Sequence, residues 1–171
     1  RDRYGTVTIN SNGFFIYTAD DSNPNVNALD VGQSLVDIFF YTLSDGQGGA
    51  STAALLVTIN GANDGPTVVN DFIAASEDTG IPGTGIVLIN DSDPEGQSLS
   101  VSAVDFNPAN VGVPVATPYG TFTIGADGSV SYAVDDANPT VNALASGATL
   151  LDSIFYTASD GNGGQTSATV T

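Results

Sequence analysis

The stretch Tyr119-Gly120-Thr121-Phe122-Thr123-Ile124 repeats an earlier one, Tyr4-Gly5-Thr6-Val7-Thr8-Ile9. The offset between the two copies is 115 residues, and it continues without a gap to the end of the chain, with about half of the paired positions identical. Self-similarity at a fixed period is the signature of tandem modules. A period of this length corresponds to one β-sandwich per repeat.

Alternation of apolar and polar residues predicts the strands of the second copy. From Ser129 to Val134 every second residue is apolar, so one face of that strand is expected to be buried and the other to face water. No stretch shows a helical period. We expect strands near 67–74, 84–90, 98–105, 119–125, 129–134, 148–158 and 165–171. Seven short strands separated by Gly and Asp turns predict an all-β fold, an immunoglobulin-like Greek-key sandwich.

The first copy begins at the equivalent of the fourth strand and is therefore incomplete. We interpret residues 1–60 as the C-terminal half of a sandwich repeat, 61–66 as a linker (Gly61-Ala62-Asn63-Asp64-Gly65-Pro66), and 67–171 as a nearly complete second repeat. The first copy has four predicted strands, near 4–10, 14–19, 34–44 and 50–60. Several of its large apolar residues are expected to lie bare, namely Phe14, Phe15, Ile38, Phe39, Phe40 and Tyr41. Either the chain is a fragment of a longer array, which we favour, or another chain supplies the missing strands.

The composition is strongly acidic. The chain has 19 Asp and Glu against two Lys and Arg, no His, and a formal net charge of −17. Such a chain repels nucleic acid and anionic membranes, so cations are its natural small partners. An alternative explanation of the acidic composition is solubility alone. We disfavour it because the acidic residues cluster in turns instead of spreading over the faces of the protein. There is no cysteine for a disulfide. No apolar run is long enough for membrane insertion, and no signal-peptide core follows Arg1-Asp2-Arg3.

Three motifs together resemble the VCBS and bacterial cadherin-like repeats of giant secreted adhesins of the RTX type. They are Asp135-Asp136-Ala137-Asn138-Pro139, Ser159-Asp160-Gly161-Asn162-Gly163-Gly164 and the linker Asn63-Asp64-Gly65-Pro66. The resemblance implies tandem cadherin-like sandwiches that form a calcium-stiffened extracellular stalk, exported by a type I pathway and acting in cell adhesion or biofilm. Its partners would be neighbouring repeats of the same chain. The chain departs from the family at Gly65, where Ala is frequent, and in the three strands that the first copy lacks.

The residues themselves indicate where Ca²⁺ would bind. In an up-and-down arrangement of strands, the loop Asn90–Gly96 and the turn Asp160–Gly164 lie at the pole of the second repeat that meets the linker, and the loop Asp20–Pro24 lies at the facing pole of the first. Ca²⁺ takes six to eight oxygens from carboxylates, amides and backbone carbonyls. The predicted ligands at this junction are Asp20, Asp21, Asn63, Asp64, Asp91, Asp93, Glu95 and Asp160.

A second acidic set is expected at the opposite pole of the second repeat, where a following linker would arrive. It consists of Glu77, Asp78, Asp135, Asp136 and Asn138. Asp45 is expected to face a preceding linker. We expect both of these sites to be partial or empty.

Several of these carboxylates have a structural alternative. Asp127 with Gly128 is expected to form a plain hairpin turn, and Asp160 is equally compatible with a turn and with a ligand. Asp37 and Asp152 are expected to accept hydrogen bonds from backbone amides.

Three other functions remain open. An enzyme is disfavoured, because without His, Cys or Lys neither the usual triads nor a zinc site can form. A sugar- or ice-binding tip domain would need an aromatic platform or a regular Thr array, which the sequence lacks. A self-assembling extracellular fibre is the main alternative, in which other copies complete residues 1–60 by strand complementation.

Overall fold

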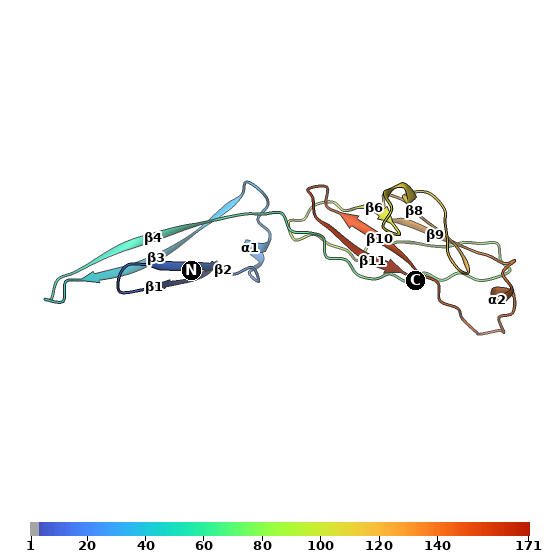
Figure 1. The fold of residues 1–171 in the computed structure, drawn as a ribbon, viewed down its shortest axis with the longest axis horizontal. Coiled ribbons are helices and arrows are strands. Elements are labelled where there is room, and N and C mark those ends of the chain that lie inside the picture. Colours follow the sequence, from blue (N-terminus) through green and yellow to red (C-terminus); the bar gives the residue numbers. More distant parts are fainter. Residues whose placement is uncertain (1–3) are drawn as a thin grey trace. The chain divides into compact units, whose positions relative to one another are not determined.

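The computed structural model describes residues 4–171, which divide into two compact units. Unit 1 ends at Asp64 and unit 2 runs from Gly65 to Thr171. Both units consist of antiparallel strands (Figure 1), so the all-β prediction is confirmed. No helix among the described residues is long and apolar enough to cross a membrane.

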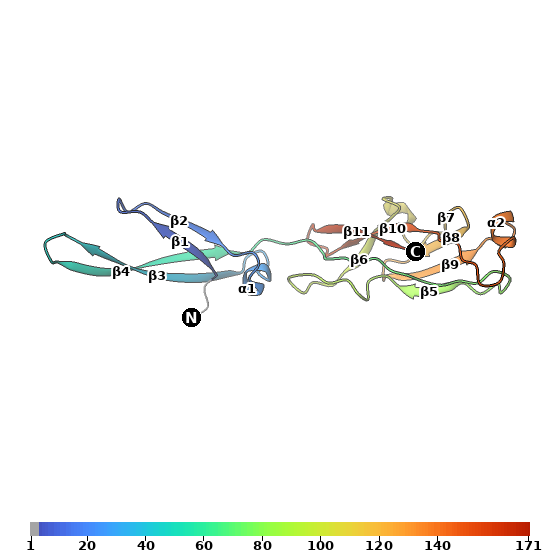
Figure 2. The same ribbon diagram turned by 90° about the horizontal axis from the view of Figure 1, so that it is seen from below.

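Unit 1 consists of two antiparallel hairpins and one helical turn. Its elements are β1 (Gly5–Ile9), β2 (Phe15–Ala19), α1 (Pro24–Asn27), β3 (Ser34–Ser44) and β4 (Ala50–Asn60). The β1–β2 hairpin lies on one face of the longer β3–β4 hairpin (Figure 2). All four strands match the predicted ranges to within a residue or two, because turn segments rich in Asn, Asp, Ser and Gly lie between them.

Unit 2 is a sandwich of a three-stranded sheet, ordered β11-β10-β6, and a four-stranded sheet, ordered β5-β9-β8-β7. Its elements are β5 (Gly83–Ile86), β6 (Ser100–Val104), η1 (Pro108–Asn110), β7 (Val115–Ala116), β8 (Gly120–Ile124), β9 (Ser129–Val134), α2 (Pro139–Asn142), β10 (Ile154–Ser159) and β11 (Gln165–Val170). The core lies between the two sheets. It includes Phe122 and Tyr132, whose rings lie 4.4 Å apart, and the fully buried Tyr156.

Several sequence predictions differ from this structure. The strand predicted over 84–90 ends at Ile86, and the short strand β7 was not predicted. Residues 67–74 form only isolated bridges, Thr67 with Ser92 and Asp71 with Val170, in place of a regular strand. The strand predicted over 148–158 begins only at Ile154. The short helices α1 and α2 were not predicted. Each has Asn as its N-cap and Pro at the first helical position, a combination that starts a helix without needing an apolar period.

The prediction that six large apolar residues of unit 1 lie bare is confirmed for three of them. Phe14, Phe15 and Phe40 are exposed, and Phe40 keeps 69% of its surface accessible. Phe39 is buried instead, at 4%, because its ring packs edge-on against Tyr17 at 5.9 Å between centroids. Ile38 and Tyr41 are half-buried.

Candidate metal centre

Three segments meet at the end of unit 2 that is nearest the linker in sequence. Thr67 and Ser92 exchange backbone hydrogen bonds of 2.8 and 3.0 Å, which fixes the start of unit 2 against the acidic loop. Ser159, the last residue of β10, lies opposite both Ser100 and Gln165, so the loop before β6 and the turn before β11 share this end. A Cβ placed on Gly65 would lie 3.7 Å from the backbone nitrogen of Gln165. Segment 65–67, loop Asp91–Gln97 and turn Asp160–Gly164 therefore gather as the sequence suggests.

Asp93 holds the acidic loop closed with one carboxylate oxygen, and its other oxygen is available to a ligand. Its Oδ1 accepts hydrogen bonds from the backbone N–H groups of Glu95 and Gln97, both at 3.1 Å. These bonds close the turn around Gly96, which has a φ of 78°, in the region that favours glycine. The second oxygen, Oδ2, is shielded from solvent and has no hydrogen-bond partner among residues 4–171. A buried carboxylate oxygen in that state is costly unless a cation or water approaches it.

Gln97 is a candidate ligand that the sequence reasoning missed. Both Oε1 and Nε2 of its side-chain amide are shielded from solvent and have no hydrogen-bond partner in the described residues. An amide oxygen is an ordinary ligand for Ca²⁺. The signal was the position of Gln97 directly after the Asp91–Gly96 loop, but a polar residue before a strand carries little information by itself.

Asp91 points away from Asp93 and into the sandwich. Its Oδ1 accepts a 2.8 Å hydrogen bond from the backbone N–H of Val69, and its Oδ2 accepts one of 3.0 Å from the hydroxyl of Tyr156. The same hydroxyl lies 3.0 Å from Oδ2 of Asp71. Burial, reinforced by the charge of Asp91, raises the pKa of Asp71, and burial together with both carboxylates raises the pKa of Tyr156. Asp91 thus ties the first segment of unit 2 to β10.

Asp160 has the role of a turn residue. Its Oδ1 accepts hydrogen bonds from the backbone N–H groups of Asn162 and Gly164 at 2.7 and 3.0 Å. The equivalent Asp45 of unit 1 makes the same bonds to Gln47 and Gly49, and these bonds lower the pKa of Asp45. Asp127 likewise accepts from the backbone and hydroxyl of Ser129, which confirms the hairpin turn.

The predicted ligands of the linker and of unit 1 belong to the other compact unit. Asn63 donates from its Nδ2 to the backbone oxygen of Asp64 at 3.0 Å. Asp20 accepts from the backbone and hydroxyl of Ser22 at 3.1 and 2.6 Å, a local turn, and Asp21 is exposed. A shared ion that includes these residues stays a prediction.

The second acidic set comes together in part. The backbone N–H of Asp78 donates to Oδ1 of Asp136 at 3.2 Å, although the two lie 58 residues apart. Asp135 instead accepts locally from Ala137, and the side-chain oxygen of Asn138 caps α2 through Thr140. Glu77 is half-buried and lines a groove that lies beside this loop.

The described residues supply only part of the ligand set that a metal ion needs. Among residues 4–171, no group of three or more His, Cys, Asp or Glu side chains is arranged to hold a metal ion. What the acidic loop does offer is one buried carboxylate oxygen, from Asp93, and one buried amide, from Gln97. All-oxygen ligands of this kind suit Ca²⁺ better than transition metals, and further ligands would be needed to complete six.

Comparison with models of protein families gives a match over residues 63–171, to the bacterial cadherin-like domain. The chain belongs to this family. A bacterial cadherin-like domain indicates an adhesion-related extracellular repeat, and such domains are typical of non-catalytic proteins. The match covers all of unit 2 and begins two residues before it, at Asn63.

The other comparisons add little to the bacterial cadherin-like assignment. None of the curated proteins compared with the chain matches it. Among solved structures, the chain is similar to an endo-fucoidan hydrolase, MfFcnA9 from glycoside hydrolase family 107, with 12% identity and a TM-score of 0.29. That alignment covers 100% of this chain and 26% of the hydrolase. A likeness at this score carries no argument about function.

Proposed function

We propose that this chain is a structural extender, a calcium-stiffened piece of the stalk of a secreted or surface bacterial adhesin of the RTX type. The observation that carries the proposal is the state of the loop Asp91–Gln97, where Oδ2 of Asp93 and the amide of Gln97 are buried without partners. The loop is held beside segment 65–67 by the Thr67–Ser92 bridge. The ion would therefore bind where unit 2 continues into the linker.

The acidic character of the chain explains why a cation would change its mechanics. With a net charge of −17, the acidic side chains of a loop repel one another, and this repulsion favours an open loop over a closed one. A Ca²⁺ bound by Asp93, Gln97 and Glu95 would neutralise part of that charge and hold the loop in one conformation beside segment 65–67. The chemistry that the ion supplies is coordination alone, consistent with a load-bearing role in adhesion or biofilm.

The test is a calcium titration of the whole chain and of the Asp93→Asn variant. Extracellular calcium modules bind with a Kd of about 10⁻⁴ to 10⁻³ M, so millimolar Ca²⁺ should raise the melting temperature and lengthen the particle in small-angle scattering. The variant should lose most of both effects. Asp105→Asn is the matched control, because Asp105 is exposed and lies outside the loop. Equal responses in the two variants would contradict the proposed role of Asp93.

A second candidate function rests on the open edges of unit 1. In unit 2, β10 pairs on one side with β11 and on the other with β6, whereas the equivalent β3 pairs with β4 alone. The open edge lies beside exposed Phe40 and Leu43. Strands from other copies could complete it and join chains into a fibre.

A further inference from the structure

Segment 67–73 of unit 2 runs beside β11 in the same direction. Asp71 and Val170 form a parallel bridge. The backbone N–H of Asp71 donates to the oxygen of Thr169 at 2.9 Å, and the backbone N–H of Thr171 donates to the oxygen of Asp71 at 3.0 Å. Asp71 therefore makes the pair of slanted bonds that is typical of a parallel ladder.

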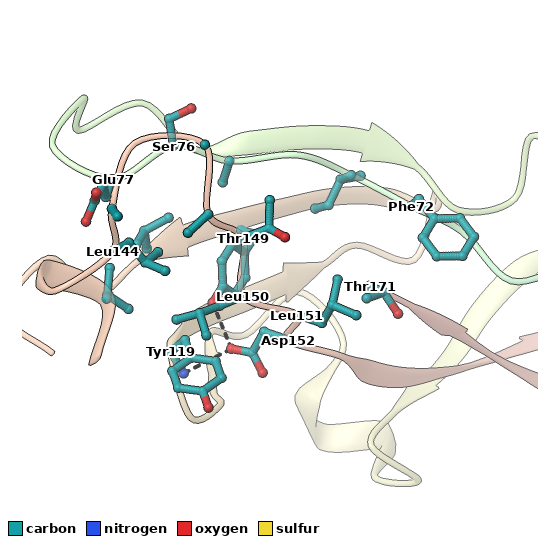
Figure 3. Close-up of a pocket in the computed structure, with 18 of the residues that line it drawn as sticks. Phe72, Ser76, Glu77, Tyr119, Leu144, Thr149, Leu150, Leu151, Asp152 and Thr171 are labelled. Carbon is teal, nitrogen blue, oxygen red and sulfur yellow. Dashed lines mark hydrogen bonds between the residues drawn. The ribbon is translucent and has the colours of Figure 1, made fainter. Parts of the chain in front are cut away.

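Two more hydrogen bonds extend this ladder. The backbone N–H of Ile73 donates to the oxygen of Thr171 at 2.9 Å, and the backbone N–H of Thr169 donates to Oδ1 of Asn70 at 3.0 Å. In Figure 3, Thr171 at the end of β11 lies close to Phe72 of the segment. Three backbone bonds and one side-chain bond thus join the segment to the last strand.

The direction of this pairing decides how unit 2 responds to tension. A chain under tension pulls unit 2 at Gly65, before the segment, and at the end of β11. Because the two paired stretches are parallel, these points lie at opposite ends of the ladder, and the pull slides one stretch along the other. All bonds of the ladder then carry the load together. In an antiparallel hairpin such as β10–β11, pulled from its two open ends, the bonds would break one after another.

Other contacts hold the segment in place along its length. At its start, Thr67 exchanges two backbone hydrogen bonds with Ser92. In the middle, the backbone N–H of Val69 donates to Oδ1 of Asp91 at 2.8 Å. At its end, the side chain of Ile73 packs against the hydrophobic core. These contacts keep the ladder in register, and they need no metal ion.

We propose that the ladder between segment 67–73 and β11 is a force-bearing clamp, a further function of unit 2 that does not require calcium. Its use in a stalk rests on the proposed function, but the clamp itself is a property of unit 2 alone. Calcium at the acidic loop would fix the conformation of that loop, whereas the ladder resists rupture. Forced unfolding is governed by the unfolding rate, so the clamp raises the rupture force without a need for greater equilibrium stability.

The test stretches single molecules of the full chain in excess chelator, between a biotin on an added C-terminal tag and one introduced cysteine. The chain has no cysteine of its own, so each attachment point is unique. Ala62→Cys applies the pull before the ladder, in the sliding direction. Ser76→Cys applies it after the ladder, at the end where β11 also finishes, so that the segment is peeled from the strand. Both residues are exposed.

The rupture force of unit 2 should be several times higher from Ala62 than from Ser76, because only the first attachment loads all bonds of the ladder at once. A matched pair of substitutions tests the ladder itself. Thr171→Pro removes the N–H that donates to Asp71, and it should lower the force measured from Ala62. Thr171→Val keeps that N–H and should leave the force unchanged.

Equal rupture forces from the two attachment points would overturn the proposal, and so would equal forces for Thr171→Pro and Thr171→Val. The comparison of attachment points requires neither Thr171 variant, so it stands even where one of them fails to fold. The calcium response of the melting temperature tests the stalk function separately. Failure of the clamp would leave that response unchanged.

Discussion

The hydroxyl of Tyr132 donates a 2.7 Å hydrogen bond to Oδ2 of Asp152, and the same pair recurs in unit 1 as Tyr17 and Asp37 at 3.1 Å. In both units the same carboxylate oxygen also accepts the backbone N–H that opens the repeated motif, from Tyr119 or Tyr4, at 3.0 Å. The amide bonds expected for Asp37 and Asp152 are therefore confirmed. The pair joins the two sheets of a repeat at one fixed point.

Replacing Asp152 by Ala should destabilise unit 2. The hydroxyls of Tyr132 and Thr117 and the amide of Tyr119 would lose one shared acceptor. Leaving such donors without a partner costs about 2 kcal/mol or more. Urea denaturation of the full chain measures the loss in the free energy of unfolding. Asp127→Ala, at an exposed hairpin turn, should leave stability nearly unchanged, and an equal loss in the two variants would contradict the structural role of Asp152.

Replacing Tyr156 by Phe should also destabilise unit 2, although the ring is kept. The hydroxyl lies within 3.3 Å of Val69 O, Val87 O, Asp71 and Asp91, and it can donate one proton among them. Its loss removes the donor from two half-buried carboxylates, at about 1–3 kcal/mol. Tyr41→Phe is the matched control, because no hydrogen bond of the Tyr41 hydroxyl is present among the described residues. Thermal melts should show a lower melting temperature for Tyr156→Phe and a nearly unchanged one for Tyr41→Phe. Equal changes in the two variants would contradict the role of the Tyr156 hydroxyl.

The stability of unit 1 should fall at high pH through Tyr17. Burial, together with the hydrogen bond and charge of Asp37, raises the pKa of Tyr17 to about 12. The unfolded value is about 10, so the neutral phenol favours the folded state. This contribution is complete below pH about 10 and is lost as the pH rises toward about 12. Phenolate absorbance should show a late titration that Tyr17→Phe removes, and a wild-type curve without that step would contradict the assignment.

Self-association should depend on the apolar face of unit 1. Phe40 and Leu43 are 69% and 62% exposed on β3, beside its open edge. The double substitution Phe40→Thr and Leu43→Thr keeps β-propensity and removes one exposed apolar side chain from each face of β3 beside that edge. If copies complete each other's strands, light scattering should show concentration-dependent assembly that this variant abolishes. A wild-type chain that stays monomeric at high concentration would argue against the fibre function.

The internal repeat explains why the fold could be predicted from the sequence. Strand β9 follows from alternation, and the duplication supports β3 and β4 because each has a counterpart strand, β10 and β11, 115 residues later. The segment 67–74 could not be predicted correctly, because its path is set by Tyr156, Asp71 and β11 and not by its own pattern. The strand predicted over 148–158 begins only at Ile154 because residues 149–153 have a strand-like sequence but pair with no strand among residues 4–171.

Only the general position of the candidate site could be predicted from the sequence. That segment 65–67, the acidic loop and the Asp160 turn share one end of unit 2 follows from loop polarity, whereas the participation of Asn63, Asp64 and the loop of unit 1 stays a prediction. The direction of each side chain does not follow from polarity. Asp91 and Asp93 alternate in sequence, yet one bonds Tyr156 in the core and the other closes its own loop. Gln97 was missed because its significance lies in the burial of its amide, which only the structure reveals.

The measurement that tests the central claim most directly is a thermal melt of the full chain in millimolar Ca²⁺ and again in excess chelator. At ten times Kd, a bound ion stabilises the folded state by about 1.4 kcal/mol, so the melting temperature of unit 2, which holds Asp93 and Gln97, should rise by several degrees. Magnesium at the same concentration should do less, because the larger, flexible oxygen site suits Ca²⁺. Identical melting curves in calcium and in chelator would contradict the calcium-stiffened stalk.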